Sequence, residues 1–152
     1  EHLFLEKIWF RDMFIQNIYL KDWDWCVKVY YAVDTFYMPE IIEDLKDLRC
    51  SSRKIKQIEM DLTQSPYNNG LTYSNFDDRC SVVVIGLTKS PEEFQNTFDH
   101  EKGHLAMHIG ECDNIDIFGE EFQYLTGEIG KLMFPIAKRF MCEHCRKDLK
   151  VE

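Results

Sequence analysis

The stretch Thr97–His108, which reads TFDHEKGHLAMH, decides how the rest of this chain is interpreted. It contains His100-Glu101-Lys102-Gly103-His104, in which two histidines stand four residues apart and a glutamate directly follows the first. Residues four apart in an α-helix lie above one another on the same face, so both imidazoles can reach one point. The stretch therefore predicts a helix that presents two imidazoles and a carboxylate together.

This HExxH pattern is the signature of zinc-dependent hydrolases. A catalytic zinc site binds protein nitrogen or oxygen atoms and keeps one position for water. We expect His100 and His104 to bind Zn²⁺ and Glu101 to be the general base that takes a proton from the bound water. Glu101 also falls in the apolar stripe between Phe98 and Leu105, where an unpaired carboxylate would be costly. The alternative is a solvated amphipathic helix whose histidines are incidental.

The residues around the motif predict the bounds of its helix and the element before it. Ser90 is placed as an N-cap, Pro91 as the first helical residue, and Glu93 three residues after the cap. Gly110 is the expected end. Residues 80–88 form a nearly continuous apolar run, which is typical of a strand that is covered on both faces.

The first third of the chain predicts strands. Residues 4–20 are rich in aromatic and β-branched side chains and indicate one or two strands, with a turn near Arg11-Asp12. Apolar residues alternate with others over 24–34, as expected for a strand with one drier face. Lys21-Asp22 between these runs can form a hairpin. The aromatic residues are therefore interpreted as core.

The next segment predicts two short helices and an edge strand. Apolar residues have helical spacing from Pro39 to Leu48 and again over 55–62, and residues 49–52 interrupt the pattern. Residues 67–70 are typical of a turn. Residues 71–74 can form a short strand at the edge of the sheet.

The region after the motif predicts a second long helix that starts at Gly119. Pro135 is expected to kink it, and Gly127 and Gly130 to allow close approach of a neighbour. Its apolar stripe comprises Phe122, Leu125, Ile129, Met133, Ile136 and Phe140. We therefore predict one α+β domain over residues 1–152, with a twisted N-terminal sheet and a possible short tail at 142–152.

The composition excludes some classes of partner. A formal net charge of −9 and a pI near 5.0 argue against nucleic-acid binding, which needs a basic surface. No apolar run has the length of a membrane span, and the N-terminal residues are acidic where a signal peptide would be basic. We therefore expect a soluble cytoplasmic protein without a membrane partner. The six cysteines match no disulfide scaffold, so reduced thiols are expected.

The motif supplies two of the three protein ligands that a catalytic zinc usually has. Glu120 stands sixteen residues beyond His104, at the start of the next predicted helix, from where an antiparallel helix pair could bring it back. At this point the pattern resembles the gluzincin metallopeptidases. In thermolysin-like members the ligand Glu is followed by apolar residues at +2 and +5 and by Gly at +7, as Glu120 is here by Phe122, Leu125 and Gly127.

The resemblance leaves the choice of the third ligand open. Tyr124 stands at +4 from Glu120, where thermolysin-like members have an acidic residue. The local likeness to the repressor-cleaving zincins of mobile elements would align Glu121 instead. The run HEKGHLAMHI, followed by GEEFQYLTGEIG, also looks like uncharacterised zincin-like proteins of bacteria and their phages, over about residues 70–140.

The resemblance implies a small zincin-like domain that binds Zn²⁺ through His100, His104 and Glu120 and cleaves peptide or protein substrates. Tyr124 or His108 would stabilise the developing oxyanion. His108 has three other interpretations: a hydrogen-bond donor beside the metal, a less favoured ligand, or a helix-end histidine bonded to a backbone carbonyl. The main rival function is a catalytically inactive zincin-fold protein with a binding, regulatory or phage-associated role.

Cys142-Glu143-His144-Cys145 is a second candidate metal motif. Its spacing suits a metal ligand pair, but a structural zinc site needs four ligands and the chain has no second CxxC. Cys80, Cys112 or a partner chain would have to complete it. The alternatives are a thiol pair at a polar tail and, as a third function, a structural zinc protein centred on this motif.

Overall fold

A mixed four-stranded sheet with the strand order β1-β2-β4-β3 forms the centre of the molecule. The computed structural model describes residues 14–33, 38–64 and 69–148. β1 pairs with β2 and β3 with β4 in antiparallel fashion, whereas β2 and β4 are parallel. β1 and β3 are therefore the edge strands. The strand bounds are β1 Ile15–Leu20, β2 Trp25–Val33, β3 Gly70–Asn75 and β4 Cys80–Gly86.

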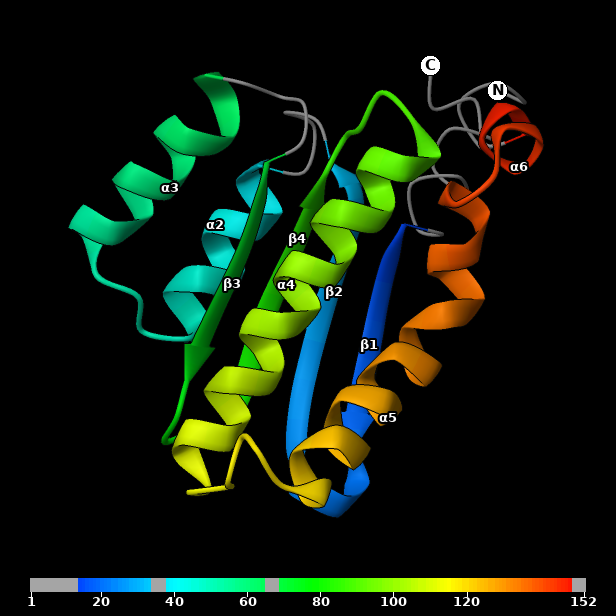
Figure 1. Ribbon diagram of the computed structural model, residues 1–152. Coiled ribbons are helices and arrows are strands. Elements are labelled where there is room, and N and C mark those ends of the chain that lie inside the picture. Colours follow the sequence, from blue (N-terminus) through cyan, green and yellow to red (C-terminus); the bar gives the residue numbers. More distant parts are fainter. Residues whose placement is uncertain (1–13, 34–37, 65–68, 149–152) are drawn as a thin grey trace.

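Helices cover both faces of the sheet, which confirms the predicted α+β class. α4 and α5 lie on one face, and α2 and α3 lie on the other side (Figure 1). Two short 3₁₀ turns, Lys21–Trp23 and Lys138–Phe140, complete the described elements. The helix bounds are α2 Met38–Asp47, α3 Ser52–Gln64, α4 Pro91–Cys112, α5 Glu120–Ala137 and α6 Glu143–Asp148. Within the described residues, no helix is both long enough and apolar enough to cross a bilayer.

Side chains alternate between the two faces of the sheet, and each face has its own apolar core. Along β2, Trp25, Val27 and Val29 pack toward α4 and α5, and Tyr30 joins the core under α2 and α3. β4 is buried on both faces, as its continuous apolar run predicts. The hairpin predicted at Lys21-Asp22 is also confirmed, because a 3₁₀ turn there joins β1 to β2.

Most predicted elements are present, with small differences in bounds. The two helices predicted between Pro39 and residue 62 are α2 and α3, and the edge strand predicted at 71–74 is β3. The prediction for 4–20 is confirmed from Ile15 onward, and the turn near Arg11-Asp12 lies outside the described residues.

The helix that carries the motif begins as predicted but ends later. The Ser90 hydroxyl accepts a hydrogen bond from the Glu93 N–H at 3.1 Å, and Pro91 is the first helical residue. α4 continues past Gly110 to Cys112, so the predicted end was wrong. Gly110 faces α5, and a Cβ there would be in ordinary van der Waals contact with the ring of Phe122 at 3.5 Å.

α5 returns antiparallel to α4. Gly110 faces Phe122 near one end of the pair, and Lys102 approaches Gly130 near the other. The predicted close approach is not seen at either glycine, because a Cβ at Gly130 would be in ordinary contact with Lys102 and a Cβ at Gly127 would meet nothing within 4 Å. Pro135 lies inside α5, which continues to Ala137.

The expected C-terminal tail is partly a packed helix. α6 spans Glu143–Asp148, and the buried Arg146 donates a hydrogen bond from Nη2 to the Thr88 carbonyl at 2.6 Å. Arg146 thereby joins α6 to the segment between β4 and α4. These residues of the expected tail are therefore helical and packed against the rest of the fold.

Candidate metal centre

The two motif histidines lie side by side on the exposed side of α4. Their Nε2 atoms are 3.1 Å apart, and their ring centroids are 4.7 Å apart. Two nitrogens bound to one tetrahedral zinc at about 2.0–2.1 Å would be about 3.3 Å apart. The geometry of His100 and His104 therefore fits two ligands of one zinc ion.

Glu101 lies next to this pair but on the buried side, where only 4% of the residue is exposed. The Thr72 hydroxyl on β3 donates a hydrogen bond to Glu101 Oε2 at 2.7 Å. The other carboxylate oxygen, Oε1, is 3.9 Å from His100 Nε2. One oxygen is thus held by the sheet and the other is turned toward the histidines, which is the arrangement that a general base beside a metal needs.

Gly70 on β3 provides the space that Glu101 occupies. A Cβ at this position would lie 2.8 to 2.9 Å from Cγ, Cδ and Oε1 of Glu101. Such distances are shorter than van der Waals contact, so only glycine leaves room for the carboxylate. The sequence interpretation assigned Gly70 to a turn and missed this role, because the glycine faces a residue thirty-one positions away.

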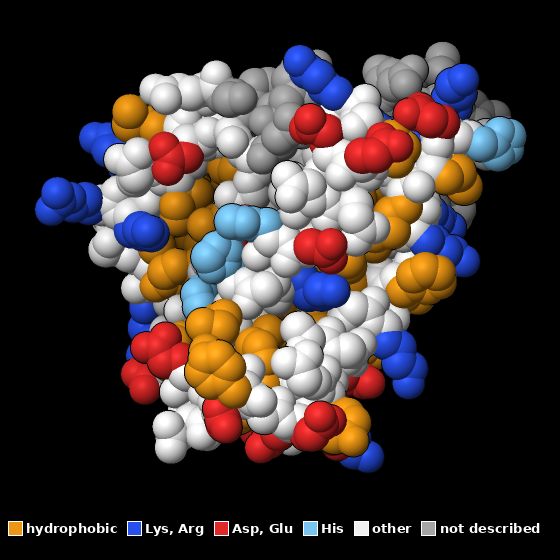
Figure 2. Space-filling view, in the orientation of Figure 1, with side chains coloured by type: hydrophobic (Ala, Val, Ile, Leu, Met, Phe, Trp, Pro, Cys, Tyr) orange, Lys and Arg blue, Asp and Glu red, His pale blue; other side chains and the backbone are white. Residues whose placement is uncertain are grey.

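A cavity of about 250 Å³ opens beside the histidines. A second cavity of about 430 Å³ between α3 and β3 shares Asn69 and Gly70 with it and is lined by the apolar residues Ile58, Leu62 and Leu71. Figure 2 shows histidine side chains in a row beside a band of hydrophobic surface. The first cavity is lined by Asn69, Gly70, Asn96, Thr97, His100 and Glu101.

The expected third ligand does not join the two histidines. At 100° per residue, Lys102 is about 160° and Gly110 about 120° around α4 from His104. Glu120 begins α5 at the end of the helix pair where Phe122 contacts Gly110, six residues beyond His104. Across residues 14–33, 38–64 and 69–148, no three His, Cys, Asp or Glu side chains form a group that could hold a metal ion. Glu121, the alternative, begins the same helix.

Tyr124 is also separated from the predicted site. It lies in the second turn of α5, and 69% of the residue is exposed. Among the described residues, Tyr124 has no hydrogen bond or ring contact with His100 or His104. Its catalytic role stays a prediction.

His108 lies in the same row as the motif histidines and contacts the sheet. Its Nδ1 is 2.7 Å from the Ser74 hydroxyl on β3, so its partner is a side chain and not the predicted backbone carbonyl. Burial lowers the pKa of His108, the nearby His104 lowers it further, and Glu111 opposes both effects. His108 therefore favours the neutral form.

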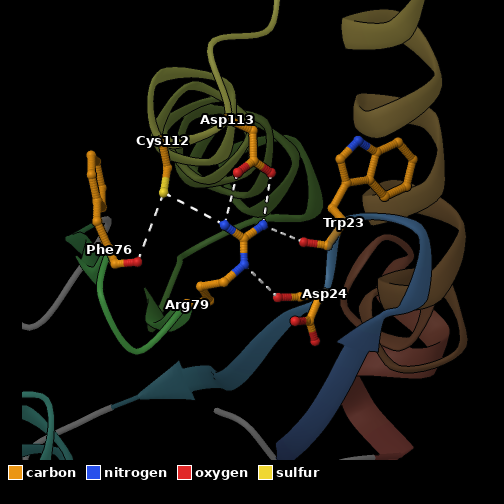
Figure 3. A network of polar contacts seen from close by, with 6 residues as sticks. All are labelled: Trp23, Asp24, Phe76, Arg79, Cys112 and Asp113. Atoms are coloured by element: carbon orange, nitrogen blue, oxygen red, sulfur yellow. Dashed lines mark hydrogen bonds and ion pairs between the residues drawn. The ribbon is translucent and has the colours of Figure 1, made fainter.

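The C-terminal end of α4 is tied to the sheet by Arg79, which sequence interpretation did not single out. Its guanidinium donates to both carboxylate oxygens of Asp113 at 2.8 Å each, and to the Asp24 carbonyl at 3.0 Å (Figure 3). The Trp23 carbonyl accepts a further hydrogen bond, and the guanidinium lies 5.1 Å from the Trp25 ring centroid. Hydrogen bonding to Asp113 raises the pKa of Arg79. This network connects three segments that are distant in sequence.

The second candidate motif is remote from the cysteines proposed to complete it. The Cys145 N–H donates to Cys142 Sγ at 3.1 Å, and α6 is joined by Arg146 to Thr88, just after β4. Cys80 is at the opposite end of β4, and Cys112 ends α4 beside the Arg79 network. The proposed completion by Cys80 or Cys112 is therefore not formed.

Neither a family model nor a curated protein nor a solved structure matches this chain.

Proposed function

We propose that this protein is a zinc-dependent hydrolase that cleaves peptide bonds, with His100 and His104 as metal ligands and Glu101 as general base. The observation that carries the proposal is the pair of Nε2 atoms 3.1 Å apart beside a buried carboxylate that Thr72 orients. Bound zinc would supply a Lewis acid that lowers the pKa of water and polarises the substrate carbonyl.

Glu101 is suited to move a proton in this reaction. Its Oε2 is engaged by Thr72, and Gly70 leaves space for the carboxylate to remain in place. Oε1 faces the histidines and can take a proton from the attacking water and deliver it to the leaving amine. Glu101 is otherwise buried and lines, with His100, the cavity of about 250 Å³.

Among the described residues no strand pairs with the outer edge of β3, and this edge favours an extended peptide as the substrate. The Gly86 N–H donates to the Asn69 carbonyl at 2.6 Å, which marks this pair as hydrogen-bonded. Hydrogen-bonded pairs alternate in an antiparallel ladder, so the next such pair is Leu71 with Val84. The N–H and C=O groups of Gly70, Thr72 and Ser74 consequently point away from β4.

An extended peptide can pair with these outward groups by strand addition. Thr72 and Ser74 contact Glu101 and His108 through their side chains, so a strand added to β3 would run beside the histidine row. Its peptide bonds would then be presented close to His100 and His104. The edge strand and the metal pair thus support the same substrate class.

The proposal is tested with a mixed peptide library that is incubated with the wild-type protein and with Glu101→Gln, with zinc measured in both by mass spectrometry. The substitution keeps the size of the side chain and removes the base, so turnover should fall by roughly 10² to 10⁴ while zinc remains bound. Equal cleavage by both proteins would indicate a contaminant and contradict the proposal.

A specific observation favours a second candidate, a zincin-fold protein that binds a partner without cleaving it. No group of three His, Cys, Asp or Glu side chains that could hold a metal occurs among the described residues, whereas catalytic zinc sites usually have three protein ligands. The outer edge of β3 would then pair with a strand of the partner. Zinc bound at one equivalent without cleavage by the wild-type protein would favour this candidate over the hydrolase.

A further inference from the structure

A chain of three hydrogen bonds connects the histidine row to the core beneath the sheet face. The Trp25 indole Nε1 donates to Ser81 Oγ at 2.8 Å, Ser81 Oγ is 2.6 Å from Ser74 Oγ, and Ser74 Oγ is 2.7 Å from His108 Nδ1. These four side chains belong to β2, β4, β3 and α4, in that order. Trp25 and Ser81 are both buried.

The chemistry of Trp25 sets the direction of this chain. An indole N–H can only donate, so Ser81 Oγ must accept from Trp25. Trp25 and Ser74 are the partners that the described part of the structure gives Ser81 Oγ, so the Ser81 hydrogen has Ser74 Oγ as its acceptor. The reverse direction would leave the buried Ser81 hydrogen without an acceptor, which is costly.

The direction then determines where the proton of His108 resides. Ser74 Oγ has Ser81 Oγ and His108 Nδ1 as its partners in the described part of the structure, so once it accepts from Ser81, His108 Nδ1 is the acceptor available for its own hydrogen. Nδ1 is therefore the acceptor nitrogen of the ring. In a neutral imidazole the other nitrogen carries the proton.

We propose that Trp25, Ser81 and Ser74 hold His108 as the neutral tautomer protonated at Nε2, which makes it a hydrogen-bond donor and not a third metal ligand. Both ring nitrogens are then occupied, one by the Ser74 hydrogen and the other by its own proton, so neither has a lone pair for a metal. This explains how three histidines in one row can serve two purposes. The donor role rests on the proposed function, because an N–H one turn beyond His104 suits a carbonyl oxygen of a peptide on β3.

The tautomer is tested by NMR on metal-free protein labelled with ¹⁵N-histidine, at a pH above the ordinary histidine pKa. His108→Gln assigns the signals. In the wild-type protein, Nδ1 should have the shift of an unprotonated nitrogen and Nε2 that of a protonated one. The opposite pattern, or an equal mixture, would overturn the proposal.

Matched variants test the role of the chain as a positioning device. Ser81→Ala removes the group that fixes the direction, so the two tautomers of His108 should become mixed. Ser81→Thr keeps the hydroxyl and should restore the wild-type pattern. A wild-type pattern in Ser81→Ala would show that Ser81 does not set the tautomer.

Cobalt(II) binding tests whether His108 is a ligand. The visible spectrum and the stoichiometry should be the same in the wild-type protein and in His108→Gln, and loss of cobalt from His108→Gln would overturn the proposal. If the wild-type protein binds no cobalt while NMR shows the Nε2–H tautomer, the proposed hydrolase fails and the hydrogen-bond chain stands.

Discussion

The two sides of α4 differ in what they do. On the side that faces β3, the helix presents polar groups that contact one another and the sheet: His100, His104 and His108, with Glu101 beneath them. On the other side it presents packing surface such as the fully buried Ala106, and Gly110 faces Phe122 of α5. Although α5 packs against α4, no α5 carboxylate among the described residues forms a metal-binding group with His100 and His104.

The largest expected effect is the loss of zinc when a histidine on the β3 side of α4 is replaced. His100→Ala should abolish stoichiometric zinc binding, because the pair is the donor set that converges on one point. Glu120→Ala is the matched control on the α5 side and should keep its zinc. Metal content after dialysis, measured by mass spectrometry, decides both. Loss of zinc from Glu120→Ala would instead identify Glu120 as the third ligand.

A substitution in the α5 interface should affect stability and spare the metal pair. Leu125 is fully buried, so Leu125→Ala should lower the free energy of unfolding by about 2–5 kcal/mol. Tyr124→Ala, one residue away on the exposed surface, should change it by less than about 0.5 kcal/mol. Urea unfolding followed by circular dichroism measures both. A large effect of Tyr124→Ala would reveal a contact for this side chain.

Gly70→Ala tests whether the Glu101 carboxylate occupies the space next to Gly70. The new Cβ would overlap the Glu101 carboxylate, and overpacking of this kind costs about 1–3 kcal/mol. Gly127→Ala is the control, since a Cβ there has open space within a helix, and it should stabilise the protein by about 0.4–1 kcal/mol. Thermal unfolding should therefore shift in opposite directions for the two variants. A stabilising Gly70→Ala would mean that Glu101 does not occupy this space.

The smallest effect is expected from the cysteine pair. Cys142→Ser combined with Cys145→Ser should leave the zinc content unchanged, because His100 and His104 supply the ligands of the proposed site. A metal analysis of the double variant checks this. If the variant lost its only zinc, the structural zinc interpretation of the CxxC motif would replace the present one.

Sequence predicted well what short-range rules determine. The start of α4 follows from Ser90 and Pro91, whose capping is local, and the position of Glu101 within the apolar stripe correctly placed it on the buried side. The end of α4 was misjudged by two residues, because Gly110 was interpreted as a stop from its low helix propensity and the helix continues to Cys112. The zinc ligation itself stays a prediction.

Sequence could not identify the β3 contribution to the site. Gly70, Thr72 and Ser74 are ordinary residues in an edge strand, and their significance depends on which residues of α4 they face. The assignment of Glu120 as third ligand stays a prediction for a similar reason. Spacing along the chain placed Glu120 within reach, but it could not tell on which side of α4 the next helix would pack.

Two arginine contacts, one at each end of α4, oppose a slide of this helix along its own axis. Arg146 holds the Thr88 carbonyl before the helix, and Arg79 holds Asp113 after it. His100, His104 and His108 repeat every four residues, so a slide by one turn, about 5.4 Å, would place another histidine pair at the same height. Leu105 would then stand opposite Gly70 in place of Glu101. With the Arg146 and Arg79 contacts in place, the histidine pair beside Gly70 is His100 and His104, which has Glu101 next to it.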